Sequence, residues 1–291
     1  MAYLEQCLID GVLLGGIYVL LAFGLTLSFG VTRVVNFAHG EFIMVGAYAA
    51  FWALALLKLD PLVSLPLAML AATVVGMLLF RLVESRILNA PDENQILLTF
   101  GLALILQNVA LILWSGDERS TNPPYAFSSL MYGELVVPGA RLIGCLVALI
   151  LVGLVFLWLR YAELGRATRA LAENREAAVL MGINVPQMYA LAFGLSVALA
   201  MAAGAILSFV SAVTPFMGFE ILGKIFAIVI LGGLGSVLGS VIGALLLGLT
   251  ETFVAYYIPE GNGWTEAVAF AVLFLVLIVR PSGIAGREIT T

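Results

Sequence analysis

The sequence predicts an all-α membrane protein, a polytopic bundle of helices, and three features of the chain lead to this prediction. Of its 291 residues, 63% are hydrophobic and only 11% are charged, which is too few charges to cover the surface of a soluble domain. Its apolar runs have the length of membrane-spanning helices and lack the alternating segments, about ten residues long, of an outer-membrane barrel. One run, at 221–257, is too long for a single span. We therefore expect a single transmembrane domain over 1–291, with about eight spanning helices and a broken, re-entrant half-helix.

The predicted helices follow one another along the chain with short polar connections. Apolar segments lie at 11–31, 40–57, 62–80, 95–115, 142–159, 187–213, 221–257 and 264–279. The seventh should divide near Gly232–Ser236 into a short half-helix and a full helix. Such breaks are tolerated in a membrane only where protein or water covers the freed backbone groups, which usually means along a transport path.

The positions of Lys and Arg predict the orientation of the bundle, because cytoplasmic loops have an excess of positive charge. With the N-terminus outside, nine of the thirteen basic residues face the cytoplasm. The cytoplasmic group is Arg33, Arg81, Arg86, Arg160, Arg166, Arg169, Arg175, Arg280 and Arg287, and the outside group is Lys58, Arg119, Arg141 and Lys224. This orientation places the loop 160–186 and the C-terminus in the cytoplasm and the loop 115–141 outside. The outer loop is then either a docking surface for an extracytoplasmic partner or a plain tether.

Small residues at a spacing of four predict where helices pack closely. One series is Ala192, Ser196, Ala200, Gly204, Ser208 and Ala212, and a second is Gly235, Gly239 and Gly243. Small side chains at this spacing let helix backbones approach one another in lipid. A short echo, LAFGLT at 21–26 and LAFGLS at 191–196, hints at two related halves.

The loop 160–186 is the longest polar interruption and the densest run of charge. Its strong helix formers predict one short helix from about Arg169 to Met181, ended by Gly182 as a C-terminal cap. The spacing of Glu176-Ala177-Ala178 and Gly182 resembles the EAA loop of ABC-importer permeases, a short cytoplasmic helix that sits in a groove on an ATPase subunit. This resemblance implies five coupling residues, namely Arg169, Glu173, Ala177, Ala178 and Gly182. A solvated loop that only holds orientation is the alternative.

Polar residues also interrupt the apolar sequence between the first two segments. Asn36, His39 and Glu41 lie there, and polar groups at membrane depth are costly and often line a path. We expect this element to approach the break in the seventh segment near an interface with a partner permease. The candidate path residues are therefore Asn36, His39, Glu41, Gly233, Gly235 and Ser236. A polar turn just inside the membrane surface is the alternative, and no metal site is expected because the single histidine has no ligand partners at suitable spacing.

The chain has no motif for chemistry of its own. The stretch 218–224 fits G-x-x-x-x-G-K, but Ile225 replaces the Ser or Thr that would reach magnesium. ATP and Mg²⁺ should therefore bind to partner subunits, and no cofactor to this chain. Neither H-E-x-x-H nor G-x-S-x-G is present, so no catalytic residue is predicted. An ion-coupled secondary carrier for a small amphipathic solute stays possible, because it needs only one or two buried carboxylates such as Glu41 or Glu251.

Four stretches together resemble one permease family. They are GVLLGGIYVLLAFGLTLSFGVTRVVNFAHGEFIMVGAY, RALAENREAAVLMGIN, AIVILGGLGSVLGSVIGALLLGLTE and VRPSGIAGR. In this order they resemble the LivH-type permeases of branched-chain amino-acid ABC importers. The resemblance implies a multi-pass subunit of a bacterial inner membrane that carries branched-chain or other hydrophobic amino acids. It also implies a heterodimer with a second homologous permease, two cytoplasmic ABC ATPases, an extracytoplasmic substrate-binding protein and no nucleic acid partner.

Overall fold

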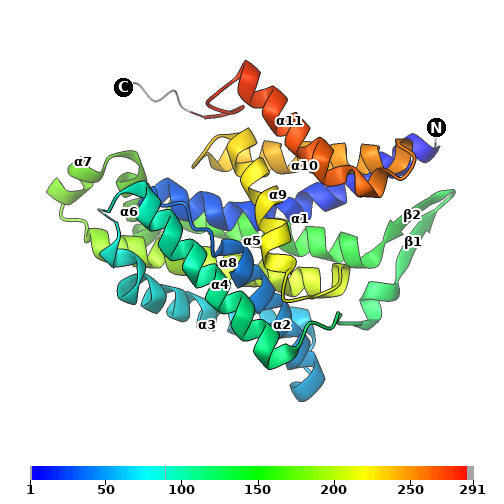
Figure 1. Cartoon of the computed structure of the whole chain (residues 1–291), viewed down its shortest axis with the longest axis horizontal. Helices are drawn as coiled ribbons and strands as arrows, with labels where there is room; N and C mark the ends of the chain where they lie inside the picture. Colours follow the sequence, from blue (N-terminus) through cyan, green and yellow to red (C-terminus); the bar gives the residue numbers. More distant parts are fainter. Residues whose placement is uncertain (1, 89, 287–291) are drawn as a thin grey trace.

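The computed structural model describes residues 2–88 and 90–286, which form an elongated bundle of helices (Figure 1). The α-helices are α1 (Ala2–Thr32), α2 (His39–Leu57), α3 (Pro61–Leu82), α4 (Asp92–Trp114), α5 (Gly139–Tyr161), α6 (Glu163–Glu173), α7 (Arg175–Leu180), α8 (Val185–Val210), α9 (Met217–Gly232), α10 (Val237–Tyr257) and α11 (Thr265–Val279). Short 3₁₀ turns lie at Glu84–Arg86, Pro124–Phe127 and Gly261–Gly263, and two strands, β1 (Ser129–Tyr132) and β2 (Leu135–Pro138), form a hairpin.

The described helices confirm the predicted class of fold. Seven of them, α1, α2, α3, α4, α5, α8 and α10, are long and apolar enough to cross a membrane. The predicted break is also present, since α9 ends at Gly232 and α10 begins at Val237. α9 has 16 residues and α11 has 15, so both are shorter than the other membrane helices, and α9 begins at Met217, before the predicted run. The small hairpin in the loop 115–141 was not predicted.

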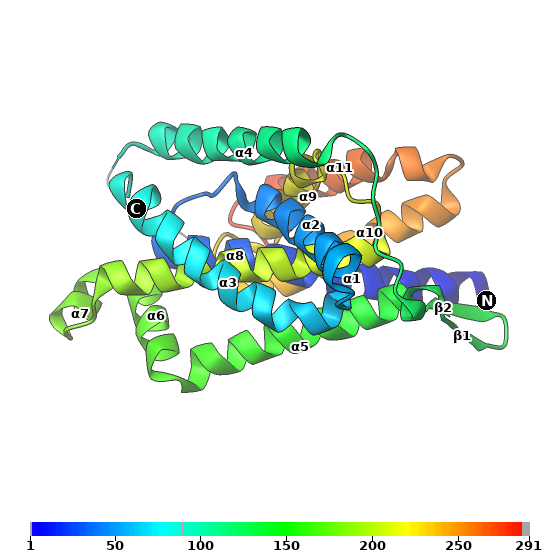
Figure 2. The same cartoon turned by 90° about the horizontal axis from the view of Figure 1, so that it is seen from below.

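The β1–β2 hairpin and the N-terminus lie at one end of the long axis, and α7 lies at the other (Figures 1 and 2). The amide of Gln6 donates to the carbonyl of Val136 (2.7 Å) and its oxygen accepts from the same residue's N–H (2.9 Å), which fastens β2 to α1. Nearby, the Tyr125 hydroxyl donates to the Asp60 carboxylate (2.9 Å). Burial and this hydrogen bond raise the pKa of the Tyr125 phenol. The outer loop is therefore an ordered cap.

The helix α2 begins deep in the bundle, beside the middle of α1. A link of six residues, 33–38, folds back along α1 after Thr32. The fully buried His39, the first residue of α2, places its Nε2 3.1 Å from the carbonyl of Leu21. Because Leu21 is eleven residues before the end of α1, α2 starts about 16 Å back along that helix. The link is thus a re-entrant element.

The helix α9, like α2, begins inside the bundle after a link that folds back, and its start lies beside the start of α2. A second link of six residues, 211–216, returns from the end of α8, and the first turn of α9 packs on the first turn of α2. At Gly40, a β-carbon would collide with the carbonyl of Gly218, and at Gly218 it would collide with the carboxyl group of Glu41. The first turns of α2 and α9 therefore meet through paired glycines.

The surrounding helices repeat this arrangement in two inverted halves. α10 packs antiparallel on α1, where Gly11 faces Leu249 and Gly15 faces Leu245. α3 packs antiparallel on α8, where Gly76 faces Gly194. The two LAFGL strings cross at the core, with Gly24 of the first against the carbonyl of Ser196 in the second. Figure 2 shows α4 and α11 along one side of the molecule and α5 on the opposite side.

Replacing Gly40 should break this junction. In Gly40→Ala the new methyl group meets backbone of α9, which cannot rotate away, so we expect a destabilisation of about 1–3 kcal/mol and a lower melting midpoint in detergent. Gly101→Ala is the control, because a β-carbon there meets nothing within 4 Å and alanine favours the helix. Equal melting midpoints for Gly40→Ala and the wild-type chain would contradict the close packing.

Candidate functional site

The loop 160–186 folds as two helices rather than one, which corrects the predicted single helix from Arg169 to Met181. α6 ends at Glu173, and Asn174 has extended backbone angles (φ −151°, ψ 105°). Its side chain accepts a hydrogen bond from the N–H of Ala177 (3.0 Å) and so caps α7. Asparagine interrupts the helix because its side chain satisfies a backbone donor that a continuous helix would have used. Residues on either side of Asn174 therefore do not share one helical face.

Gly182 ends α7 as predicted. Its φ is +80°, the left-handed conformation that favours glycine. The N–H of Gly182 bonds the carbonyl of Val179 (3.0 Å), and the N–H of Ile183 bonds that of Ala178 (3.1 Å), which is the hydrogen-bond pattern of a Schellman cap. No atom lies within 4 Å of where a β-carbon would be, so the backbone conformation alone requires glycine here.

The exposed surface of α7 differs from the predicted one. Ala178 is buried within the chain, so it is not free to enter a groove on a partner, whereas Arg169, Glu173 and Ala177 are exposed. Three large apolar side chains protrude instead at the end of α7. They are Val179 (54% exposed), Leu180 (88%) and Met181 (82%). We call these three residues the α7 tip.

The predicted path residues Asn36, His39 and Glu41 are all buried, and the first two shape the re-entrant link. The side chain of Asn36 accepts from the N–H of Ala38 (2.9 Å), and its carbonyl accepts from the N–H of His39 (3.3 Å). The Glu41 carboxyl group lies against Gly218 at the start of α9. These residues hold the junction of α2 and α9.

The break between α9 and α10 is built by Gly233 (φ +101°), Gly235 (φ +79°) and Ser236. The Ser236 hydroxyl accepts from the N–H of Gly239 (3.1 Å) and caps α10. The C-terminal segment covers the freed backbone, since the N–H groups of Ile284 and Ala285 bond the carbonyls of Leu231 and Gly232. Arg287, one of the predicted cytoplasmic arginines, lies outside the described residues.

One cavity of about 250 Å³ lies between the two interruptions. Its lining is apolar and comprises Leu25, Phe29, Val35, Phe37, Phe226, Val229, Ile230 and Leu234. Val35 and Phe37 belong to the link before α2, and Leu234 belongs to the break before α10, so the two predicted elements do flank one space. They face it through apolar side chains rather than through the predicted polar residues.

The sequence patterns do not predict a group of three polar residues, of which Tyr18 and Glu251 are buried and Lys224 is partly exposed. The Tyr18 hydroxyl of α1 donates to Glu251 of α10 (2.6 Å), and the Lys224 ammonium of α9 lies 3.2 Å from the same carboxylate. Lys224 also donates to the Tyr18 hydroxyl (3.4 Å). The sequence prediction placed Lys224 outside. It lies instead in the middle of α9, so it is no guide to the orientation of the loops.

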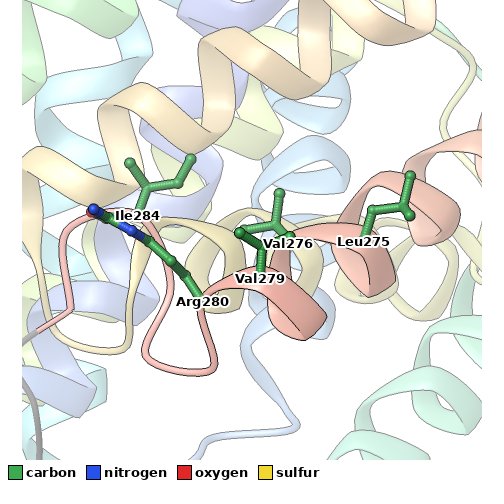
Figure 3. Close-up of a pocket in the computed structure, with 5 residues that line it drawn as sticks. All are labelled: Leu275, Val276, Val279, Arg280 and Ile284. Atoms are coloured by element: carbon green, nitrogen blue, oxygen red, sulfur yellow. The ribbon is translucent and has the colours of Figure 1, made fainter.

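A second hollow lies on the surface beside α11 (Figure 3). It has a volume of about 330 Å³ and is lined by Leu275, Val276, Val279, Arg280 and Ile284. Figure 3 shows these side chains coming from the end of α11 and from the C-terminal segment that follows it. Its only polar side chain, Arg280, donates to the Ile284 carbonyl (3.2 Å), so the hollow offers no group for chemistry. No group of metal ligands is found among the described residues either.

Comparison with known proteins identifies the family. The family described as "Branched-chain amino acid transport system / permease component" matches residues 7–277. The chain belongs to this permease family. The high-affinity branched-chain amino acid permease BraD of Pseudomonas aeruginosa is 35% identical, with 98% of this chain and 96% of BraD covered. LivH of Escherichia coli is 33% identical with the same coverage. No solved structure matches the chain.

Membership of this permease family decides what class of protein the chain is and which partner subunits it implies. The chain is a multi-pass membrane protein and a permease subunit of an ABC importer, which decides against the ion-coupled carrier. LivM of Salmonella typhimurium, a second type of permease, is also similar, at 27% identity over 92% of this chain and 67% of LivM. In that bacterium LivH is similar as well, at 32% identity. A second permease and separate ATPase subunits are therefore implied for this chain.

Removing the cap of α7 should loosen the loop 160–186. In Asn174→Ala the N–H of Ala177 loses its acceptor, at a cost of about 1 kcal/mol, and hydrogen exchange at that amide should become about fivefold faster. Asn174→Asp keeps the acceptor and should exchange like the wild-type chain. Unchanged exchange in Asn174→Ala would show that the cap does not hold α7.

Proposed function

We propose that this chain is one half of the translocation path of an ATP-driven importer for branched-chain or other hydrophobic amino acids. The observation that supports this proposal most directly is its similarity, over nearly the whole chain, to permeases named for branched-chain amino acid transport. The importer would lie in a bacterial inner membrane. It would contain a second homologous permease as the other half of a heterodimer, two cytoplasmic ABC ATPases and an extracytoplasmic substrate-binding protein.

In the proposed importer, this chain has no catalytic site. ATP and Mg²⁺ would bind to the ATPases, and this chain would transmit their movement. The proposed orientation has the N-terminus and the loop 115–141 outside and the loop 160–186 and the C-terminus in the cytoplasm. The β1–β2 hairpin, with Leu130, Met131 and Tyr132 exposed, would then face the binding protein.

The proposed coupling element is α6 with α7. The α7 tip (Val179, Leu180 and Met181) would insert into a groove on an ATPase, because three large apolar side chains exposed to water are stabilised by such burial. Arg169, Glu173 and Ala177 would lie at the rim, where exposed ion pairs contribute only about 0–1 kcal/mol each. Ala178 and Gly182 would act from inside the loop by fixing the direction in which the tip points.

The proposed path runs beside the junction of α2 and α9. Asn36, His39 and Glu41 would hold the re-entrant link, while Gly233, Gly235 and Ser236 would hold the break before α10. A substrate with an apolar side chain would pass a mostly apolar wall such as the one around Phe37 and Phe226. Weak contacts suit this task, because a tightly bound substrate would not leave.

Changing Gly182 should uncouple transport from ATP hydrolysis. Gly182→Val forces a β-branched residue into a left-handed cap at a cost of about 1 kcal/mol or more, and it redirects the α7 tip. We expect ATP-driven leucine uptake by the complex in proteoliposomes to fall while the complex still hydrolyses ATP, or the ATPase to dissociate.

A matched control separates coupling from backbone strain. Gly133→Val in the β1–β2 hairpin has the same kind of backbone (φ +64°) and equally open surroundings, but it lies at the other end of the molecule. Because the hairpin is proposed to face the binding protein, this control is measured without that protein. Gly133→Val should leave the ATPases bound and the unstimulated ATP hydrolysis of the complex intact. Full leucine uptake and full stimulated hydrolysis in Gly182→Val would mean that the loop is a tether.

A further inference from the structure

The charged residues of α9 are unusual because they lie at membrane depth. Lys224 is the one basic residue in the middle of a described membrane helix, and Tyr18, which it contacts, lies near the middle of α1. The helix α9 itself begins at the junction with α2, well inside the bundle. Ionisable groups at such depth are expensive and usually mark a pathway.

The ammonium of Lys224 is held, but not enclosed, by its partners. Glu251 is almost fully buried (5% side-chain exposure), whereas the Lys224 side chain is 23% exposed. The Lys224 ammonium lies 3.4 Å from the Tyr18 hydroxyl and 3.2 and 3.3 Å from the two oxygens of the Glu251 carboxylate. Because its side chain is still partly exposed, a group outside the bundle can reach it.

An acidic residue lies one turn before it on the same helix. Glu220 precedes Lys224 by four residues, and side chains at this spacing lie on the same face of a helix. Glu220 is exposed and makes no ion pair with any residue in the described parts of the chain, since Lys224 turns to Glu251 instead. A carboxylate and an ammonium are thus presented separately on one face.

The exposed surface beside these charges is apolar. Phe216 (46% exposed), four residues before Glu220, lies on the same face, and Phe219 (59%) lies on the adjoining face. Figure 2 shows α9 between α4 and α11 on one side of the molecule. A face with both charges would be costly against hydrocarbon, so it must adjoin a partner or a water-filled path.

We infer that Glu220 and Lys224 form a transient polar station for the head group of a zwitterionic amino acid, an inference that rests on the proposed function. The substrate's ammonium would bind Glu220, and its carboxylate would accept a hydrogen bond from the partly exposed ammonium of Lys224. Phe216 and Phe219 would contact its aliphatic side chain. Glu251 and Tyr18 are positioning residues, because they hold the ammonium of Lys224 without touching the substrate.

The test measures leucine uptake and binding-protein-stimulated ATP hydrolysis by the whole complex in proteoliposomes. Glu220→Gln keeps the shape and removes the charge, so uptake should fall about tenfold or more, the loss expected for one hydrogen bond to a charged group, while stimulated hydrolysis continues. Glu220→Asp should retain most of the uptake. Glu5→Gln, at an exposed carboxylate near the start of α1, is the control and should behave like the wild-type chain.

A second variant distinguishes a role of Lys224 in contacting the substrate from a role of the Lys224–Glu251 pair in holding the helices together. Lys224→Met/Glu251→Gln removes both members of the buried pair together, so neither charge is left uncompensated and the complex should still assemble. We expect assembly and ATP hydrolysis without normal uptake. Wild-type uptake in this variant or in Glu220→Gln would overturn the inference about Glu220 and Lys224 and leave the proposed function standing. Absence of amino-acid uptake by the wild-type complex would instead overturn the proposed function, and this inference with it.

Discussion

The structure depends on one constraint, which is that backbone groups inside a membrane must be covered by protein. The chain breaks its helices at depth twice, before α2 and before α9, and these two breaks meet each other at Gly40 and Gly218. Each half-helix is covered by a long helix of the other half of the chain, α2 by α8 and α9 by α1. The β1–β2 hairpin and α7 lie at opposite ends of the bundle, because α5 runs the length of the bundle between them.

This arrangement separates the tasks that an importer requires. The fixed parts are the antiparallel pairs α1 with α10 and α3 with α8, which pack through small residues. The parts with unusual surfaces lie outside these pairs, at the α7 tip and on the exposed face of α9. Weak contact at α9 would guide a zwitterion without holding it, and the α7 tip would transmit the movement of an ATPase from the end of the molecule.

Much of this fold follows from local patterns in the sequence. Hydropathy locates the membrane helices, the glycine-rich stretch locates the break after α9, and Gly182 ends α7 as its spacing predicts. Long-range packing explains what was missed. Ala178 is buried because α7 packs against α6 and α8. The Asn174 cap is local, but an asparagine inside a run of strong helix formers does not by itself show that the helix is interrupted there. The count of Lys and Arg places Lys224 outside, and no local pattern shows its position inside the bundle, because its partners Glu251 and Tyr18 are 27 and 206 residues away in the sequence.

The central claim is that the hairpin and the coupling loop face opposite sides of the membrane, with α7 in the cytoplasm. The direct measurement is labelling by an impermeant maleimide of single cysteines introduced at Tyr132 and at Leu180, both more than 80% exposed, in a chain without Cys7 and Cys145. We expect that intact cells label only Tyr132→Cys. In cells that make the permease without its ATPases, Leu180→Cys should react only once the membrane is opened. Labelling of Leu180→Cys in intact cells would contradict the proposed orientation and the coupling role of α7.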